Sequence, residues 1–358
     1  MKILRVYFRL PPLKGGMENH IKYLSLEQAK FHEVTIAFSN GADIDNVNCL
    51  RVLSRLNLFT KKVNPMTASL FYLTLIIKII KSNQSYDVVH LHGDWSSFLF
   101  GPLLRFASNA KKLVFSLHGT LETHNLLALF FLKKTLSFAD VVFSTGKETY
   151  DQIMPFCKKI VFQPSGVVSG FFENSKVKMD NECNNRKKII TIANLVPAKN
   201  IQCVLRIAML NPNYNFIIIG EGKDRWCLQE FLESNKIENV FLSGSLQISE
   251  IINYLDVGDV FLLTSILEGT PTAVMEAMAR GLPIVCSNAG GAESLVINNI
   301  NGYVIKHDYN DAQSYSDAID LIVKSRVLYQ TMSLNNIEKA QLFKWNVVAQ
   351  RISSEMLY

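Results

Sequence analysis

The chain has 358 residues, and at roughly 100 to 200 residues per domain this length predicts two domains that fold without disulfide or metal support. Hydrophobic residues make up 48% and charged residues 19% of the chain, which excludes disorder and collagen-like repeats. The longest apolar run, residues 70–77, is broken by Lys78 and is well short of the ~20 residues of a spanning helix. The six cysteines lie far apart with no Cys-x-x-Cys pair, which favours reduced thiols over a disulfide or zinc framework.

The net charge of +6 is unevenly distributed along the chain. Residues 1–165 contain 20 Lys and Arg against 11 Asp and Glu, a surplus of +9, whereas residues 166–358 contain 17 against 20, or −3. A basic half suits a nucleic acid, an anionic membrane face or a phosphorylated substrate, or it is only a solvated surface. Charge alone does not choose among these.

Short apolar runs alternate with helical segments along both halves, the pattern of parallel strands joined by helices. The strands predicted in the first half cover residues 3–8, 33–38, 88–91, 113–117, 141–144 and 159–163. The opening strand contains Arg5 and no small-residue cleavage site follows it, so we expect a cytoplasmic protein without a signal peptide.

The polar segment 173–188 is predicted to be a linker. Strands then resume at residues 188–193, 215–219, 240–243, 260–264 and 283–286. The sequence therefore predicts two doubly wound α/β domains in tandem. Ligands of such sheets bind outside the carboxyl ends of the strands.

The segment 262–291, LLTSILEGTPTAVMEAMARGLPIVCSNAGG, joins a predicted strand to a helix. We expect the helix to begin at Thr270, which would cap its free amides, with Pro271 in the first turn. Its N-terminus then offers unpaired N–H groups and a partial positive charge to a phosphate. Glu268 precedes the helix and Glu276 lies about two turns after it. Both carboxylates accept hydroxyl protons, which suits a sugar and a ribose, although a solvated glutamate pair would have the same sequence.

The spacing Glu268-x7-Glu276, followed by Gly290 and Gly291, resembles the signature of retaining glycosyltransferases of the GT4 family. Six further segments resemble the family in the same order along the chain: PPLKGGMENH (11–20), DVVHLHG (87–93), LHGT (117–120), IANLVPAKN (192–200), IIIGEGKDR (217–225) and FKWNVVAQR (343–351).

This resemblance implies the GT-B fold, two Rossmann-like doubly wound domains facing a central cleft. The acceptor-side domain would cover residues 1–172 and the domain that binds the nucleotide sugar residues 173–342. A C-terminal helix over 343–358 would pack back on the first domain. The resemblance also implies an enzyme with no cofactor and no required divalent metal, whose donor substrate is a UDP- or GDP-sugar.

In the second domain, the resemblance implies that Glu268 binds hydroxyls of the donor sugar and acts in catalysis, and that Glu276 binds the ribose. Lys199 matches a catalytic lysine directed at the diphosphate, where a fixed cation stabilises the departing nucleotide. The remaining donor-binding candidates are Asn194, Gly220, Gly222, Gly244, Leu246, Gly269, Thr270 and Thr272. Asn194 stands where Arg is commoner in the family, and the candidates for the missing cation are Arg225, Lys14 and Arg9.

In the first domain, Gly15 and Gly16 lie between a strand and a helix, in a loop that borders the donor phosphate in the family; a simple tight turn is the alternative. His118 ends a predicted strand and matches a catalytic histidine near the donor sugar. His92 is a weaker candidate, and we expect His90 to lie in the core. The His-x-His spacing also occurs in metal sites, but no acidic or histidine partner stands at ligand spacing in the sequence, so we predict no metal site.

Other functions have less support from the residues. Gly220-Glu-Gly222 lacks the third glycine of a dinucleotide motif, because Arg225 stands there. A nucleotide-sugar epimerase of the same fold is one alternative, and the Glu-x7-Glu spacing argues against it. A nucleic-acid-binding protein is the other; the basic residues are scattered and aromatic-rich basic strands are absent from the sequence, so we expect no nucleic-acid partner.

Two segments bear on the acceptor, 69–81 (SLFYLTLIIKIIK) and 126–134 (LLALFFLKK), which combine bulky apolar residues with lysines. Such segments lie at a membrane interface in some proteins and form core helices in others, and amphipathicity alone does not separate the two. We expect a lipid-linked or saccharide acceptor in the synthesis of a surface polysaccharide (O-antigen, capsule or lipopolysaccharide). We also expect peripheral contact with anionic lipid on the cytoplasmic face of the inner membrane.

Overall fold

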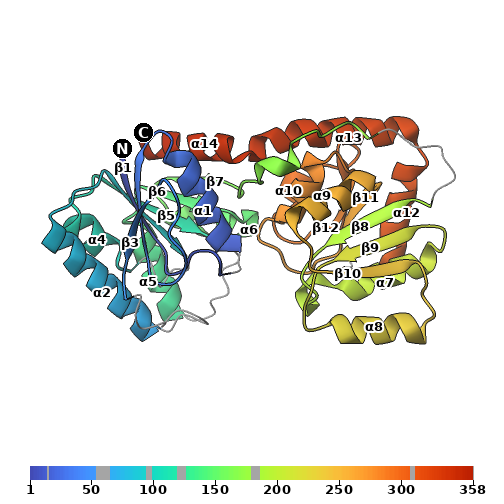
Figure 1. Ribbon diagram of the computed structural model, residues 1–358, viewed down its shortest axis with the longest axis horizontal. Helices are drawn as coiled ribbons and strands as arrows, with labels where there is room; N and C mark the ends of the chain where they lie inside the picture. The colour runs from blue at the N-terminus through green and yellow to red at the C-terminus, as the bar shows by residue number, and fades with distance from the viewer. Residues whose placement is uncertain are drawn as a thin grey trace. The chain divides into compact units, whose positions relative to one another are not determined.

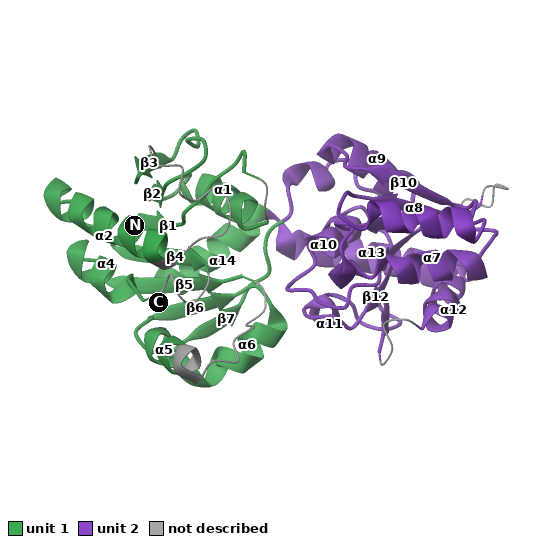
Figure 2. Ribbon diagram, turned by 90° about the horizontal axis from the view of Figure 1, so that it is seen from below, with its two compact units in different colours: residues 1–166, 345–358 green, residues 167–344 purple. Residues whose placement is uncertain are grey.

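The computed structural model describes residues 1–13, 16–53, 65–93, 99–118, 126–178, 186–306 and 311–357. The chain divides into two compact units (Figure 2). Unit 1 combines residues 1–166 with residues 345–358, and unit 2 contains residues 167–344. The sequence-based boundaries were expected at 172/173 and 342/343, six and two residues from these divisions.

Over its described residues, unit 1 has a seven-stranded parallel sheet in the order β3-β2-β1-β4-β5-β6-β7 (Figure 1). The strands are β1 (Lys2–Val6), β2 (Glu33–Phe38), β3 (Asn48–Arg51), β4 (Val88–Gly93), β5 (Lys112–Leu117), β6 (Val141–Ser144) and β7 (Ile160–Phe162). Every residue of β4 is buried, as expected for a parallel strand covered by helices on both faces. The strand order reverses between β1 and β4, the position where open α/β sheets bind ligands.

Over its described residues, unit 2 has a six-stranded parallel sheet in the order β10-β9-β8-β11-β12-β13. The strands are β8 (Lys188–Ile192), β9 (Asn215–Ile219), β10 (Val240–Gly244), β11 (Val260–Leu263), β12 (Ile284–Ser287) and β13 (Gly302–Ile305). Ile189 and Ile190 of β8 belong to different buried clusters, because successive side chains of a strand point to opposite faces of the sheet. The order reverses between β8 and β11.

Helices connect these strands in both units. Those of unit 1 are α1 (Gly16–Gln28), α2 (Pro65–Ser82), α4 (Gly101–Ala107), α5 (Leu126–Leu136), α6 (Lys147–Ile153), η2 (Met154–Phe156) and α14 (Trp345–Leu357). Those of unit 2 are η3 (Ser169–Phe171), η4 (Pro197–Lys199), α7 (Ile201–Leu210), α8 (Arg225–Ser234), α9 (Ile248–Val257), α10 (Thr272–Ala279), α11 (Ala292–Leu295), α12 (Ala312–Val323), α13 (Arg326–Ala340) and η5 (Gln341–Phe343).

All predicted strands are present, with ends that differ by at most two residues. The edge strands β3 and β13 were not predicted. The predicted apolar segments 69–81 and 126–134 form α2 and α5.

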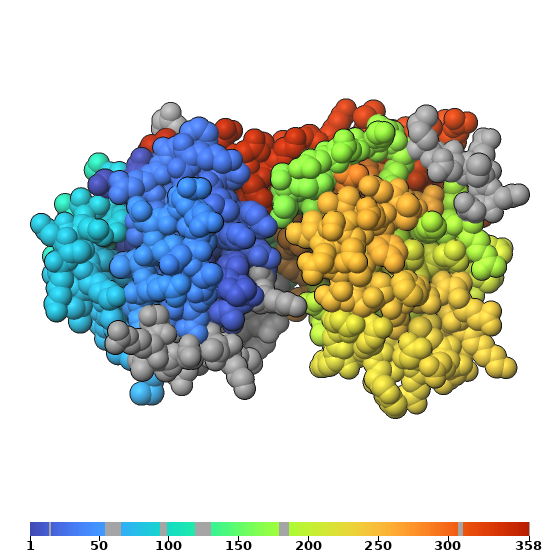
Figure 3. Space-filling model, in the orientation of Figure 1, coloured from blue at the N-terminus to red at the C-terminus, as the bar shows by residue number. Residues whose placement is uncertain are grey.

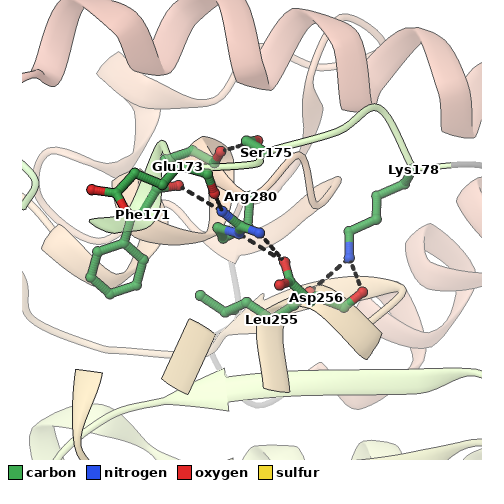
Figure 4. Close-up of polar contacts among 8 residues, drawn as sticks. Phe171, Glu173, Ser175, Lys178, Leu255, Asp256 and Arg280 are labelled. Carbon is green, nitrogen blue, oxygen red and sulfur yellow. Dashed lines mark hydrogen bonds and ion pairs between the residues drawn. The ribbon is translucent and has the colours of Figure 1, made fainter. Parts of the chain in front are cut away.

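The prediction of a linker over residues 173–188 is wrong for the first six of them, which are part of unit 2 and are hydrogen-bonded to its helices (Figure 4). The buried Arg280 donates to the carbonyl oxygen of Glu173 at 2.6 Å. Lys178 donates through Nζ to a carbonyl oxygen near the end of α9 at 2.8 Å. The polar composition that suggested a linker therefore belongs, over residues 173–178, to a segment fixed by hydrogen bonds. The division between the units lies upstream, at 166/167.

The last helix, α14, belongs to unit 1 although the chain reaches it from unit 2. Trp345, Val348 and Ile352 are buried in the same core as strands β1 and β4. Gly166 lies against the Trp345 ring, and an added Cβ would stand 2.4 Å from it. Because α14 packs on α1, the core of unit 1 is built from both ends of the chain.

Candidate functional site

A cavity of about 330 Å³ opens in unit 2 at the carboxyl ends of β8, β9, β10 and β11. This is the reversal point of the strand order, where the loops after neighbouring strands diverge and leave room for a ligand. The predicted residues that line it are Asn194, Lys199, Gly220, Leu246, Glu268, Thr270, Thr272 and Glu276.

Lys199 and Glu268 form an ion pair in the wall of this cavity. The distance from Lys199 Nζ to Glu268 Oε1 is 2.5 Å, and the Ser265 hydroxyl donates to the same oxygen at 2.7 Å. The Glu268 side chain is 9% exposed and that of Lys199 22%. Charge-assisted hydrogen bonds of this length are strong, so the carboxylate is fixed from two sides.

Backbone hydrogen bonds between two loops bring this pair together. Lys199 ends η4, after β8, and Glu268 lies in the loop after β11. Ile266 N donates to the carbonyl oxygen of Ala198 at 2.8 Å, and Thr264 Oγ1 to that of Lys199 at 3.3 Å. Ser265 was not predicted, because a serine after a strand has no distinguishing sequence signal.

Gly290 and Gly291 pack against the backbone of the Glu268 loop. Gly290 has φ +54°, and a Cβ added there would lie 1.8 Å from the carbonyl oxygen of Glu268. Gly291 N donates to the carbonyl oxygen of Gly269 at 2.7 Å. Only glycine allows both the left-handed conformation and this close approach without strain.

Three predicted glycines lie around the cavity rather than facing it. Gly222 packs against the backbone of Leu195, and Gly244 ends β10 beside the Glu221 side chain. Gly269 is held by its bond from Gly291. None of the three lines the cavity among the residues that the structure describes, so their role there is to shape the loops.

The helix after Glu268 begins later than predicted. α10 starts at Thr272, and Pro271, at φ −72° and ψ 103°, precedes it without a side-chain cap. The predicted cap by Thr270 is therefore wrong, because the extended conformation of Pro271 makes Pro271, and not Thr270, the residue that precedes the first helical turn. Thr270 to Ala273 line the cavity, so the N-terminus of α10, with its partial positive charge, faces the space a ligand would occupy.

Glu276 lies one turn further along α10 and reaches the same cavity. Burial raises the pKa of its carboxyl from the usual 4.5 to about 7. Among the described residues, its carboxyl oxygens have no hydrogen-bond or ion-pair partner. A half-buried carboxyl without a partner, next to the start of a helix, is available to a ligand.

The candidates for the missing cation at Asn194 already have partners where the structure describes them. Arg9 pairs with Glu18 at 2.9 Å and Arg225 with Glu221 at 2.9 Å. Lys14 lies outside the described residues, and so does Gly15. Gly16 begins α1, and a Cβ added there would meet no atom within 4 Å.

His118 follows β5 in unit 1, and its Nε2 lies 3.2 Å from Nδ1 of His92. Burial lowers the pKa of His118 to about 4, so its imidazole is neutral at physiological pH. His90 is fully buried and its Nε2 lies 2.7 Å from Ser116 Oγ, as predicted for a core residue. The expectation that His92 has no histidine partner is wrong, because sequence spacing gives no information on contacts between different strands.

A second exposed feature of unit 1 is the outer stripe of α2, which we call the α2 stripe. Its members recur every three or four residues on the solvent side of the helix: Met66, Leu70, Leu73, Ile77 and Ile80, all exposed. The inner stripe, which includes Phe71, Leu75 and Ile79, lies in the core. The helix is thus apolar on both faces. α4 lies beside α2 and adds the exposed Phe106 (Figures 1 and 3).

None of the helices in the described parts of the chain is both long and apolar enough to cross a membrane.

Comparison with known proteins gives two family matches that together span most of the chain. Residues 14–168 match the family described as Glycosyltransferase Family 4, and residues 174–339 match Glycosyl transferases group 1.

Curated relatives include enzymes named for lipid substrates. The phosphatidylinositol N-acetylglucosaminyltransferase GPI3 subunit of Saccharomyces cerevisiae (strain YJM789) is 26% identical over 368 residues, covering 95% of this chain and 79% of that protein. The UDP-Gal:alpha-D-GlcNAc-diphosphoundecaprenol alpha-1,3-galactosyltransferase of Escherichia coli is 27% identical over 283 residues, covering 71% of this chain and 70% of that protein.

Among solved structures, Anabaena Alr3699/HepE in complex with UDP has a TM-score of 0.78 at 18% identity, with 99% of each chain covered. The same protein in complex with UDP-glucose has a TM-score of 0.73, covering 99% of this chain and 98% of that one.

Proposed function

This chain belongs to the GT4-type glycosyltransferases with the GT-B fold, and we propose that it is a retaining enzyme that transfers a sugar from a nucleotide-diphosphate donor to an acceptor hydroxyl. The observation that carries the proposal is the cavity of unit 2, where the Lys199–Glu268 pair, Glu276 and the N-terminus of α10 converge. A cation, a helix N-terminus and two carboxyls are the complement of a diphosphate flanked by two hydroxyl-rich rings.

Each end of the donor has its own partner in this proposal. The diphosphate lies between Lys199 and the first amides of α10, the ribose hydroxyls donate to Glu276, and the transferred sugar donates to Glu268. A uridine nucleotide is the first candidate, because the solved structures with this fold include one with bound UDP and UDP-glucose. No divalent metal is required when a lysine and a helix N-terminus take up the charge.

Glu268 suits a binding role better than that of a nucleophile. Its Oε1 already accepts hydrogen bonds from Lys199 and Ser265, so this oxygen is engaged within the protein and is not free to attack the sugar. We infer that the acceptor hydroxyl oxygen attacks the anomeric carbon on the face from which the diphosphate leaves. The bond from that carbon to the phosphate oxygen breaks, and the hydroxyl proton passes to the departing phosphate. Lys199 stabilises the negative charge that develops there.

The donor is tested with a thermal-shift panel of UDP- and GDP-sugars in the presence of EDTA. The cognate nucleotide should raise the unfolding temperature of the wild type, since ligand at 100 times its Kd adds about 2.7 kcal/mol. The effective donor is then incubated with and without acceptors. Turnover of the donor alone to an isomeric sugar nucleotide would identify an epimerase, and no stabilisation by any sugar nucleotide would contradict the proposal.

The α2 stripe supports a lipid-linked acceptor in the synthesis of a surface polysaccharide. Residues 1–165 carry a charge surplus of +9, and the lysines of α2, Lys78 and Lys81, are exposed beside the stripe. Apolar side chains next to lysines fit the boundary of an anionic bilayer. The named relatives act on phosphatidylinositol and on a diphosphoundecaprenol-linked sugar, both lipids with anionic groups. We propose that the α2 stripe docks on the cytoplasmic face of the membrane.

Flotation with liposomes tests this docking. We expect the protein to float with anionic vesicles at low salt and much less with neutral ones. A Leu73→Ser/Ile77→Ser double variant should lose flotation, whereas Val327→Ser, at an exposed position on α13 of unit 2, should not. Equal flotation of the two variants would rule out the α2 stripe, and no flotation of the wild type at any salt concentration would rule out docking.

A further inference from the structure

Three histidines from separate segments of unit 1 converge on one point. His20 comes from α1, His92 from β4 and His118 from the end of β5, and one ring nitrogen of each lies within 4.8 Å of the others. Their ring centroids are 4.6, 5.5 and 5.7 Å apart. These residues stand 26 to 98 positions apart in the sequence, so only the fold brings them together.

The separations match those of three imidazoles on one tetrahedral ion. With metal–nitrogen bonds of 2.0–2.1 Å, two ligand nitrogens stand about 3.3 Å apart and the ring centroids about 5.2 Å apart. The observed 3.2 Å between His92 Nδ1 and His118 Nε2 agrees with the first value. The third nitrogen, within 4.8 Å, needs to move by at most about 1.5 Å to complete the set.

One ring nitrogen of this cluster that could bind the ion is buried and lacks a partner. His20 is 3% exposed, and its Nε2 has no hydrogen bond among the residues that the structure describes. In His92 the nitrogen that faces His118 is Nδ1, and the outer Nε2 has no hydrogen bond among those residues. His20 Nδ1, by contrast, lies 2.9 Å from Ser165 Oγ. A metal-binding histidine commonly uses one nitrogen for the ion and the other for an outer hydrogen bond that orients the ring, as Ser165 does here.

The protonation state of the cluster also suits a metal. Burial, followed by the neighbouring histidines and the positive charge of Arg5, holds the pKa values of His20 and His92 well below the usual range, and burial lowers that of His118 to about 4. All three are therefore neutral imidazoles at physiological pH, the form that binds zinc or cobalt.

From this geometry we infer that His20, His92 and His118 form a binding site for a divalent transition metal such as Zn²⁺ or Co²⁺. Three histidines leave the fourth tetrahedral position to water, hydroxide or another small anion. Arg5, whose guanidinium lies 3.5 Å from His90 Nδ1, adds positive charge nearby that opposes a bound dication, so an anionic fourth ligand is favoured to offset it. No carboxylate joins the three imidazoles in the part of the chain that the structure describes.

If the proposed function is correct, metal binding should also inhibit sugar transfer. His118 is the histidine expected near the donor sugar, and an ion that occupies its ring nitrogen takes it away from that role. The metal is then an inhibitor and not a cofactor.

Titration with Co²⁺ tests the site without any substrate. The full-length chain, without a polyhistidine tag, is stripped with EDTA and titrated while the visible absorption of tetrahedral Co²⁺ is recorded. We expect one Co²⁺ per chain without a thiolate charge-transfer band, which separates the histidine cluster from the free cysteines. His92→Asn and His118→Asn should bind at least about 100-fold more weakly, and Ser165→Ala about 10-fold more weakly. His32→Asn, a histidine of the same unit outside the cluster, should bind as the wild type does.

Circular dichroism of each metal-free variant establishes that it is folded, and His118, which is less deeply buried than His92, gives a second variant should His92→Asn unfold. Unchanged Co²⁺ binding in a folded His118→Asn variant, or no stoichiometric binding by the wild type, would overturn the inference. The inhibition is measured separately: Zn²⁺ should reduce sugar transfer, and EDTA should restore it. A chain that binds Co²⁺ but transfers no sugar would retain the metal site and refute the proposed function.

Discussion

Lys199 and Glu268 show how two side chains, 69 positions apart in the sequence, act as one unit. The carboxylate orients the ammonium group, and both face the same cavity. Lysine is a compact charge on a flexible stem, so without this partner its position in the cavity would be far less defined.

Lys199→Ala should therefore reduce transfer strongly while the fold persists. Loss of a single group that stabilises the developing charge costs about 10²–10³ in kcat, because the leaving nucleotide departs as an anion. Lys199 ends the short helix η4 and is partly exposed, so the fold should persist, with a modest fall in the unfolding temperature from the loss of the ion pair with Glu268. Initial rates and thermal melts measure the two effects. Lys223→Ala, at an exposed lysine of the same unit, is the control, and a Lys199→Ala enzyme as active as this control would contradict the assigned role.

If Glu276 binds the ribose as proposed, nucleotide binding should depend on pH. The pKa of Glu276 is raised to about 7, so the folded protein holds the carboxyl protonated below pH 7, whereas an unfolded chain would ionise it above the usual 4.5. If the carboxylate accepts the ribose hydroxyls, the affinity for UDP should rise about tenfold from pH 6 to pH 8, as the ionised fraction rises. Isothermal titration calorimetry at several pH values measures this rise.

The Glu276→Gln variant distinguishes the effect of ionising the Glu276 carboxyl on UDP affinity from that of ionising the UDP phosphates, which occurs in the same pH range. It should bind UDP with a flatter pH profile than the wild type. Since ionising a buried carboxyl destabilises the fold, the variant should also unfold at a higher temperature than the wild type above pH 7. Identical pH profiles of the two proteins would show that Glu276 does not contact the ribose.

At this scale, the sequence predicted the residues of the cavity better than their local conformation. Resemblance to a family pointed to Glu268 and Glu276 through their Glu-x7-Glu spacing, and to Lys199 through the separate segment 192–200. It gave no indication of Ser265, whose role depends on a loop conformation. The predicted cap at Thr270 was wrong because the helix begins two residues later, after an extended Pro271, and the general preferences of threonine and proline for helix starts do not reveal this.

At the scale of elements, the Glu268 loop and the segment that begins at Gly290 form one structure. The loop is hydrogen-bonded to Ala198 through Ile266 N and to Gly291 through the carbonyl oxygen of Gly269, and Gly290 packs directly against its backbone. The conformation of the Glu268 loop thus depends on residues about 22 positions later in the chain.

Gly290→Ala should consequently damage both stability and activity. A non-glycine residue at φ +54° costs about 1–2 kcal/mol, and the added Cβ would overlap the carbonyl oxygen of Glu268, which forces the loop to move. Chemical denaturation gives the loss of stability, and transfer rates give the displacement of Glu268. Gly170→Ala is the matched control in unit 2, because its Cβ would meet only Ile252 at 3.6 Å. If both variants behave alike, the close packing of Gly290 has no energetic importance.

The strands show where sequence patterns identify elements and where they do not. The central strands β1, β4, β8 and β11 are covered on both faces and are therefore continuous apolar runs, which periodicity detects. The missed strands β3 and β13 are edge strands, and β3 has no buried residue. An edge strand needs less apolar sequence because it is partly solvated, so its sequence resembles that of a loop.

At the scale of the whole molecule, the two units have separate cores, but unit 1 is formed from two segments of the chain that are separated in sequence by unit 2. Helix α14 supplies Trp345, Val348 and Ile352 to the core of unit 1 after the chain has completed unit 2. The ion pair between Lys159 and Glu355, at 2.7 Å, adds a polar contact within the same unit. Unit 1 can therefore complete its core only when the last 14 residues are in place.

Ile352→Ala should for this reason destabilise one unit selectively. Ile352 is 1% exposed, and truncating a buried isoleucine to alanine costs about 2–5 kcal/mol through lost burial and the cavity left behind. In hydrogen exchange, amides of β1, β4 and α1 should lose protection, while those of β8 and β11 keep it, because the cores share no buried residue. Leu357→Ala, at an exposed position of the same helix, should leave both patterns unchanged. Equal loss of protection in the two sheets would mean that the units unfold as one cooperative body and that α14 couples them. Loss confined to unit 1 would show that the end of the chain stabilises the domain in which the chain begins.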